Sequence, residues 1–143
     1  MNTQELETVK RLNLPIKFFV LNNQGYGSIR ATQRNYFQGF YVASSPDSGL
    51  TLPDTTKVAE AYGIPALRLE NHDGLQEKVR RILNCEGPFV CEVMTSLEQM
   101  TMPRVSSMQR PDGTMVSKPL EDLWPFLDRR EFLANMIVSP LEE

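Results

Sequence analysis

The chain has 143 residues, of which 41% are hydrophobic and 23% charged, a composition typical of a folded, soluble domain. Its formal net charge is −3 at pH 7, so overall charge provides no attraction to nucleic acid or anionic lipid. No stretch approaches the roughly 20 apolar residues of a membrane span, and the polar opening MNTQELETVK lacks the apolar segment of a secretory signal. We therefore expect a cytoplasmic protein without nucleic-acid or membrane partners.

The first third of the chain predicts a helix, a strand and a second helix. Leu6, Val9 and Leu12 recur at helical spacing, and Pro15 lies beyond the end of that helix. The following KFFVL is short and rich in β-formers, which predicts a strand covered on both faces of a parallel sheet. After a Gly-containing turn, SIRATQRN can start the second helix.

The middle of the chain alternates between helical and extended patterns. Asp54 can cap a helix that Gly63 closes, and IPALRL then forms a strand. An amphipathic helix with Leu75, Val79 and Ile82 leads to the strand PFVCEVM. Strands that alternate with helices predict a three-layer α/β/α fold with a mostly parallel sheet.

The C-terminal third is less regular. Residues 95–119 show little periodicity and contain the turn signal Pro-Asp-Gly. LEDLWPFL and DRREFLANMI look like short helices, the second capped by Asp128. We therefore divide the chain into residues 1–100 and an irregular, partly helical tail, residues 101–143. The aromatic and apolar residues of this tail are expected to be packing anchors: Trp124, Phe126, Phe132 and Leu133.

Neither the two cysteines nor the single histidine indicates a reactive site. Cys85 ends a predicted helix and Cys91 lies within a strand, with no nearby histidine to complete a zinc site. We expect both to be small packing residues. His72 lies in a polar turn, where a solvated side chain is expected.

The turn after KFFVL carries the residues with the clearest chemistry. In open α/β sheets, ligands bind at the carboxyl ends of the strands, where Asn22 and Asn23 fall. An asparagine oxygen and a backbone carbonyl suit a hard cation, and Gly25 and Gly27 allow close approach of the main chain. Amides at the start of the next helix favour a phosphate. A purely structural turn has the same residue types, so the pattern alone leaves both interpretations open.

The run MNTQELETVKRLNLPIKFFVLNNQGYG resembles the second half of the thiamin diphosphate signature, and it is most similar to that of the acetolactate synthase (acetohydroxyacid synthase) family. The similarity extends through PFVCEVMTS, and KPLEDLWPFL resembles the C-terminal ends of such proteins. The resemblance implies a thiamin diphosphate- and Mg²⁺-dependent enzyme that decarboxylates a 2-keto acid and transfers the two-carbon unit. It also implies a homodimer or higher homo-oligomer and leaves FAD possible in the intact enzyme.

The resemblance also assigns roles to residues of this turn. It implies that the Asn23 side chain and the Gly25 carbonyl bind Mg²⁺ and that Asn22 supports the diphosphate environment. Residues further along would hold the cofactor through backbone amides or lie near the thiazolium and substrate: Tyr26, Gly27, Ser28 and Ile29.

Several departures from the family pattern shape the expectation. The family's upstream Gly-Asp-Gly, whose aspartate binds the metal, has no counterpart here, so we expect a C-terminal portion of a longer enzyme that catalyses nothing by itself. Ser28 and Thr32 stand where typical members have methionine and tryptophan, which implies a smaller, more polar pocket. Ile29 stands where pyruvate decarboxylases have a glutamate, which disfavours simple aldehyde release.

Three interpretations stay open from the sequence. Arg30 and Arg34, four residues apart, could bind a carboxylate or phosphate, although we favour surface or interface roles. The segment from Thr101 to Pro119, with Arg104, Arg110 and Lys118, is either an active-site cover or a mobile tail. The alternative to an enzyme is a noncatalytic α/β binding or interaction module.

Overall fold

The computed structural model describes residues 2–110 and 112–140 and divides into two compact units, Met1–Gln99 and Met100–Glu143. The first unit contains all the elements predicted for an α/β domain. In chain order these are α1 (Glu5–Arg11), β1 (Lys17–Asn22), α2 (Gly27–Tyr36), the 3₁₀ turn η1 (Pro46–Ser48), α3 (Thr55–Ala61), β2 (Ala66–Leu69), α4 (Leu75–Asn84) and β3 (Phe89–Met94).

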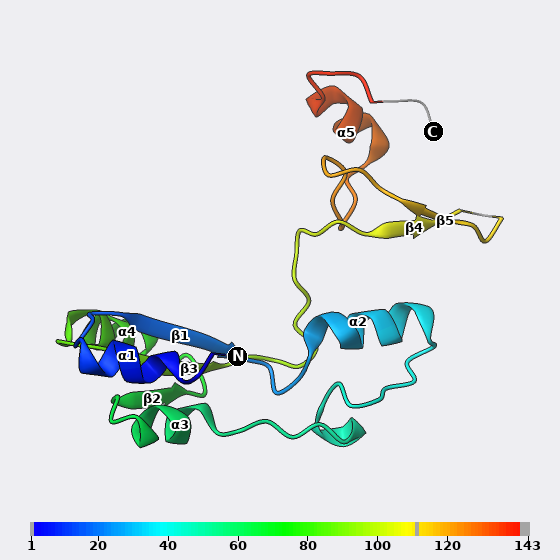
Figure 1. Cartoon of the computed structure of the whole chain (residues 1–143). Coiled ribbons are helices and arrows are strands. Elements are labelled where there is room, and N and C mark those ends of the chain that lie inside the picture. The colour runs from blue at the N-terminus through cyan, green and yellow to red at the C-terminus, as the bar shows by residue number, and fades with distance from the viewer. Residues whose placement is uncertain (1, 111, 141–143) are drawn as a thin grey trace. The chain divides into compact units, whose positions relative to one another are not determined.

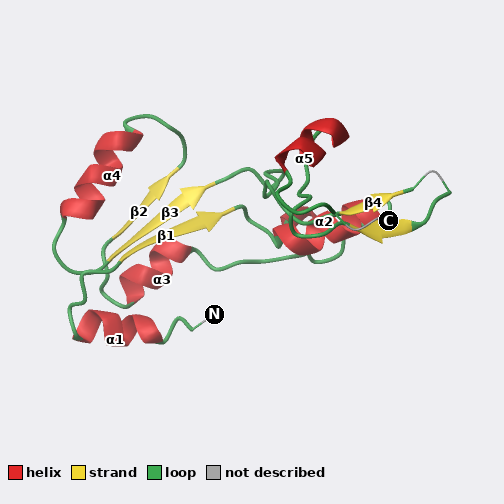
Figure 2. Cartoon of the chain, turned by 90° about the horizontal axis from the view of Figure 1, so that it is seen from above, coloured by secondary structure: helices red, strands yellow, loops and turns green. Residues whose placement is uncertain are grey.

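The three strands of this unit form one parallel sheet in the order β1-β3-β2. β3, the last strand in sequence, is therefore the central one. Figure 2 shows α1 and α3 on one face of the sheet and α4 on the other, whereas Figure 1 shows α2 beyond the end of β1. This arrangement confirms the predicted three-layer α/β/α fold with a parallel sheet.

Alternate residues of β3 supply the two halves of the core. Val90 packs with Val9 of α1 and Ala59 of α3, whereas its neighbour Cys91 packs with Ile82 of α4 and Leu69 of β2. Successive strand side chains point to opposite faces, so one strand can serve both layers. The central strand is covered on both sides for this reason.

The prediction that KFFVL would be covered on both faces is wrong for this chain. β1 lies at an edge of the sheet, and Phe19 and Leu21 are 39% and 72% exposed. Register places these two residues on the face of Cys91 and Val93, which α4 covers over β2 and β3. Hydrophobic pattern cannot distinguish an edge strand from a central one, because both are built from the same β-formers.

Most predicted helix boundaries are confirmed. α1 ends at Arg11, before Pro15, and Asp54 caps α3 by accepting the amides of Thr56 and Lys57 at 3.0 and 3.1 Å. Gly63 follows α3 with φ of +67°, the left-handed conformation that suits glycine at this place. Among the described residues, no helix combines the length and apolar character needed to cross a membrane.

The second unit is a short hairpin followed by a helix. β4 (Ser107–Gln109) and β5 (Met115–Ser117) pair antiparallel, and α5 (Arg129–Asn135) begins after Asp128, which accepts the amide of Arg130 at 2.9 Å. The predicted helix at DRREFLANMI and its Asp128 cap are thus confirmed. Of the predicted turn Pro-Asp-Gly between the strands, Pro111 lies outside the described residues.

Two expectations for the C-terminal region are wrong. The segment expected to be irregular contains the β4–β5 hairpin, and LEDLWPFL is not a helix. The backbone of Trp124 instead pairs with that of Arg104, at 3.0 and 2.8 Å, and Pro125 cannot supply a helical amide. Phe132 is buried, as expected of a packing anchor, but Leu133 is 56% exposed.

The two neighbours Ile82 and Leu83 test how α4 packs. Ile82 is 2% exposed and Leu83 is 57% exposed. Ile82→Ala should lower the free energy of unfolding of the sheet unit by about 2–4 kcal/mol, because it leaves a cavity against Leu69 and Cys91. Leu83→Ala, the matched control, should change it by less than about 0.5 kcal/mol. Urea denaturation followed by circular dichroism measures both, and equal losses would contradict this packing.

Candidate functional site: the turn between β1 and α2

The main chain after β1 makes two consecutive asparagine turns. The Asn22 side-chain oxygen Oδ1 accepts the amide of Gln24 at 2.7 Å, and Asn23 Oδ1 accepts the amide of Gly25 at 3.1 Å. Such side-chain bonds two residues along the chain mimic a backbone turn. Gln24 has φ of +56°, a left-handed conformation uncommon for residues other than glycine. The asparagine pair therefore has a structural task in this chain.

Gly25 is required by the protein's own backbone. A Cβ atom at this position would lie 2.6 Å from the Ser44 carbonyl oxygen and 2.8 Å from Leu97 Cδ1. The same carbonyl accepts the amide of Tyr26 at 2.9 Å. The close approach expected at Gly25 is thus made by residue 44, and it holds the turn against the loop before α3.

The amino end of α2 presents the remaining predicted site residues. Tyr26 precedes the helix, and Gly27, Ser28 and Ile29 form its first turn, where amides have no partner inside the helix. Tyr26 and Ile29 are 47% and 49% exposed, so this turn is accessible. Because Gly25 and Tyr26 already donate their amides within the chain, an anion at this end would be held by the amides that follow them.

The two arginines of α2 have structural partners. Arg30 is buried and donates from Nη1 to Ser45 Oγ at 2.8 Å and from Nη2 to Glu98 Oε1 at 3.1 Å, with its guanidinium 3.9 Å from the centre of the Tyr41 ring. Arg34 pairs with the other oxygen of Glu98. The surface or interface role favoured for Arg30 is therefore wrong: it joins α2 to the 41–48 loop and to the segment that follows β3.

A buried charge network beside the turn was missed by the sequence analysis. Glu92 of β3 is fully buried, with Oε1 2.6 Å from Asn22 Nδ2 and Oε2 2.5 Å from Arg68 Nε. Arg68 also pairs with Asp54, the cap of α3, at 3.0 Å. The available signal was a pair of opposite charges inside two apolar strands, ALRL and PFVCEVM. A charge in a buried strand needs a partner.

The partners of these carboxylates decide their protonation. Burial alone would raise the pKa of Glu92, but bonds from Arg68, Asn22 and Thr55 outweigh it and hold the pKa below the ordinary value. For Asp54, the Thr56 hydroxyl, the Lys57 amide and Arg68 hold the pKa well below its usual range. Both groups are thus negatively charged near neutral pH.

The oxygen atoms of the turn provide only part of the ligand set that a divalent cation requires. Asn23 Oδ1 accepts one hydrogen bond and keeps a second lone pair for coordination, and the Gly25 carbonyl is a further oxygen. The described residues 2–110 and 112–140 contain no group of three or more His, Cys, Asp or Glu that could hold a metal ion. Neutral oxygens thus dominate this turn, and Mg²⁺ sites usually include one or two carboxylates.

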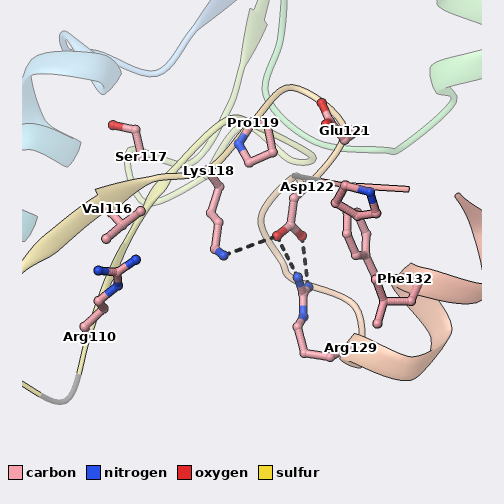
Figure 3. Close-up of a pocket in the computed structure, with 11 residues that line it drawn as sticks. Arg110, Val116, Ser117, Lys118, Pro119, Glu121, Asp122, Arg129 and Phe132 are labelled. Carbon is pink, nitrogen blue, oxygen red and sulfur yellow. Dashed lines mark hydrogen bonds and ion pairs between the residues drawn. The ribbon is translucent and has the colours of Figure 1, made fainter. Parts of the chain in front are cut away.

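A separate pocket of about 550 Å³ lies within the C-terminal unit. Figure 3 shows Lys118 and Arg129 directed at Asp122, which receives two bonds from Arg129 at 2.6 and 2.9 Å and lies 3.8 Å from Lys118. These contacts, led by Arg129, hold the pKa of Asp122 below its ordinary value. Lys118, which belongs to the segment expected to be either an active-site cover or a mobile tail, is buried within this unit.

Of the two cysteines, Cys91 has the packing role predicted for it, whereas Cys85 is only half-buried. Cys91 is fully buried beside Ile82, and burial raises the pKa of its thiol, which weakens it as a nucleophile. Cys85 donates its thiol hydrogen to the Ile82 carbonyl at 3.0 Å.

Gly25→Ala tests the close approach in the turn. The added methyl group would collide with the Ser44 carbonyl, so the free energy of unfolding should fall by about 1–3 kcal/mol. Gly27→Ala is the matched control, because its Cβ meets only the end of the Asn23 side chain, at 3.1 Å. Chemical denaturation measures both, and equal effects would show that residue 44 does not constrain the turn.

Asp122 makes the C-terminal unit sensitive to acid. Because its folded pKa lies below that of an unfolded aspartate, about 3.9, its contribution to stability is present above that pH and is lost as the pH falls through the folded pKa. Asp122→Asn should lower the denaturation midpoint at pH 6 and reduce its further fall at pH 3. Fluorescence of Trp124, the single tryptophan, reports on this unit. Exposed Glu121→Gln is the control; an unchanged midpoint in Asp122→Asn at pH 6 would contradict the assignment.

Comparison with known proteins identifies the family. Residues 1–93 match the family model described as "Thiamine pyrophosphate enzyme, C-terminal TPP binding domain". The chain is 31% identical over 111 residues to acetolactate synthase 2, chloroplastic, of Nicotiana tabacum, covering 75% of this chain and 17% of that protein. It is 33% identical over 123 residues to the acetolactate synthase isozyme 2 large subunit of Escherichia coli (strain K12), covering 86% of this chain and 21% of that protein.

The match therefore spans about a fifth of the length of these relatives. It includes β1, the asparagine turn and the start of α2, as well as the sheet that carries them. The chain thus belongs to the thiamine pyrophosphate enzyme family, as a C-terminal TPP-binding domain similar to that of acetolactate synthases.

Proposed function

We propose that this chain is the part of a thiamin diphosphate (TPP)- and Mg²⁺-dependent enzyme that holds the metal and the cofactor diphosphate. The whole enzyme would act on 2-keto acids, with acetolactate synthase-like decarboxylation and carboligation. The observation that supports this most directly is the turn itself, in which a strand end, paired asparagines and an open helix start coincide within a matched TPP-binding domain.

In this proposal each residue of the turn has a separate task. The Asn23 amide oxygen and the Gly25 carbonyl bind Mg²⁺, while Asn22 holds the turn through Gln24. The amides that open α2 hold the diphosphate, because helix starts carry a partial positive charge. Bound TPP supplies the electron sink that decarboxylation of a 2-keto acid requires.

The first turn of α2 would face the substrate. Ser28 and Ile29 are exposed there, and Thr32 donates its hydroxyl hydrogen to the Ser28 carbonyl at 3.1 Å, which uses its single donor inside the helix. This leaves a small surface on which Ser28 contributes a polar hydroxyl group and Ile29 an apolar side chain. A compact 2-keto acid acceptor fits such a surface better than a large polar one.

The oligomeric state, the cellular location and a flavin cofactor are also part of the proposal. Three aromatic residues that end α2 or follow it, Tyr36, Phe37 and Phe40, are 53%, 60% and 74% exposed, which favours a homodimer or higher homo-oligomer. We propose a cytoplasmic location, although relatives include chloroplastic and mitochondrial proteins. FAD stays possible in the intact enzyme.

The metal site gives the sharpest test. Without a carboxylate ligand, the 143-residue chain should bind Mg²⁺ and TPP only weakly by calorimetry and should not consume pyruvate. Asn23→Asp places a negative charge on the proposed ligand and should raise Mg²⁺ affinity by at least about tenfold. Tight binding by the unaltered chain would contradict the proposed incompleteness of the site.

Gln24→Glu is the matched control for that experiment. It adds the same charge one residue away, on an exposed side chain that is not a proposed ligand. Its Mg²⁺ affinity should rise much less than that of Asn23→Asp. If the two variants behave alike, the cation responds to general charge and Asn23 is not a ligand.

Pyruvate offered with a panel of keto-acid and aldehyde acceptors to an intact enzyme containing this chain would identify the reaction.

A further inference from the structure

We infer that Glu92 is a positioning residue: it fixes the orientation of the Asn22 side-chain amide and, through it, the conformation of residues 22–25. The connection to a cofactor rests on the function proposed above, whereas the connection between the residues does not. Glu92 contacts none of the proposed ligands directly and acts through Asn22.

The two ends of the Asn22 amide have different partners. Its nitrogen donates to Glu92 Oε1 at 2.6 Å, and its oxygen accepts the Gln24 amide at 2.7 Å. An ionised carboxylate can only accept hydrogen bonds. If the amide rotated by half a turn, its oxygen would face the carboxylate and its nitrogen would face the Gln24 N–H. Both new contacts are repulsive, so the carboxylate selects one orientation.

The orientation of the Asn22 amide matters because Gln24, two residues further along, has a strained backbone conformation. Gln24 has φ of +56°, which is unfavourable for a residue with a Cβ atom. The bond from its amide to Asn22 Oδ1 compensates for this conformation locally. Asn23 and Gly25 follow directly, and the Gly25 amide returns to Asn23 Oδ1. A reversed Asn22 amide would thus change the backbone conformation at both proposed metal-binding residues, Asn23 and Gly25.

The sheet register explains how Glu92 reaches Asn22. Val20 of β1 pairs with Glu92 of β3, and Asn22, two residues later, shares the face of Val20. On the other side Arg68 of β2 also pairs with Glu92 in register. The carboxylate therefore receives one donor from each neighbouring strand, one on each oxygen.

Stability alone does not account for this arrangement. A buried ion pair is often no more stabilising than apolar residues of the same volume, because both charges lose their hydration. A carboxylate is nevertheless the group that can accept from Asn22 and from Arg68 at once. A glutamine at position 92 has one acceptor atom and one donor group. The charged Arg68 is the stronger donor and would keep the acceptor atom, so the bond from Asn22 would be lost.

Hydrogen exchange measured by NMR on the 143-residue chain tests the inference. In Glu92→Gln, the protection of the Gln24 amide should fall by about tenfold, the equivalent of one lost hydrogen bond. The Val90 amide, which donates to the Pro65 carbonyl at 3.0 Å, reports on the sheet and should keep its protection. Glu70→Gln, an exposed glutamate next to β2, is the matched control and should change neither amide.

A double-mutant comparison separates positioning from general loss of structure. Asn22→Ala should remove the Gln24 protection by itself, and adding Glu92→Gln should then cause no further loss at Gln24. An additive effect, an unchanged Gln24 amide in Glu92→Gln, or equal losses at Gln24 and Val90 would each overturn the inference.

If Glu92→Gln does not fold, hydrogen exchange in the unaltered chain still tests the inference. Asn71 makes the same turn as Asn22, accepting the Asp73 amide at 2.9 Å, and its side chain is exposed. The side-chain NH₂ of Asn22 should exchange at least about tenfold more slowly than that of Asn71, because it donates to a buried carboxylate. Equal rates would overturn the inference. None of these measurements depends on TPP binding, so failure here and failure of the proposed function are distinguishable.

Discussion

The buried carboxylate of Glu92 joins the three strands of the sheet. It accepts hydrogen bonds from Asn22 of β1 and Arg68 of β2, and Arg68 continues the network to Asp54 at the start of α3. A charge at the centre of a sheet is costly unless each of its oxygens has a donor. Because the donors come from different elements, the relative positions of the strand ends, and the turn that follows β1, depend on this one group.

The turn is held from a second side by the segment that follows α2. Ser44 offers its carbonyl to Tyr26, and Arg30 ties the first turns of α2 to Ser45 and Glu98. These contacts leave the start of α2 accessible while its flanks are constrained. Such preorganisation is what a diphosphate or metal site requires, since binding then orders few additional groups. The charge that a bound Mg²⁺ would need is supplied only in part by these residues, which are neutral oxygens and backbone amides.

Family membership and the geometry of the turn describe different levels of function. The match to a TPP-binding domain covers residues 1–93 and identifies the family. The hydrogen bonds of Asn22, Asn23 and Gly25 explain why these residue types occur at the turn. Gly25 illustrates the difference, because its carbonyl is proposed to bind the metal, whereas the Ser44 carbonyl leaves no room for a side chain at this position. Both requirements can act on the same residue.

Within residues 1–99, the order of elements, the parallel three-layer fold and the place of the asparagine turn could all be predicted from the sequence. These follow from local signals: apolar periodicity, the Asp54 cap, and a chain that alternates helix and strand. The structure was needed to show that β1 lies at an edge, that Arg30 is buried, that residues 107–117 form a hairpin, and that Glu92 contacts Asn22 and Arg68. Apart from the hairpin, which pairs residues close in the chain, these features depend on residues far apart in the sequence, with Glu92 70 positions from Asn22. A local pattern does not specify which distant partner a side chain will meet.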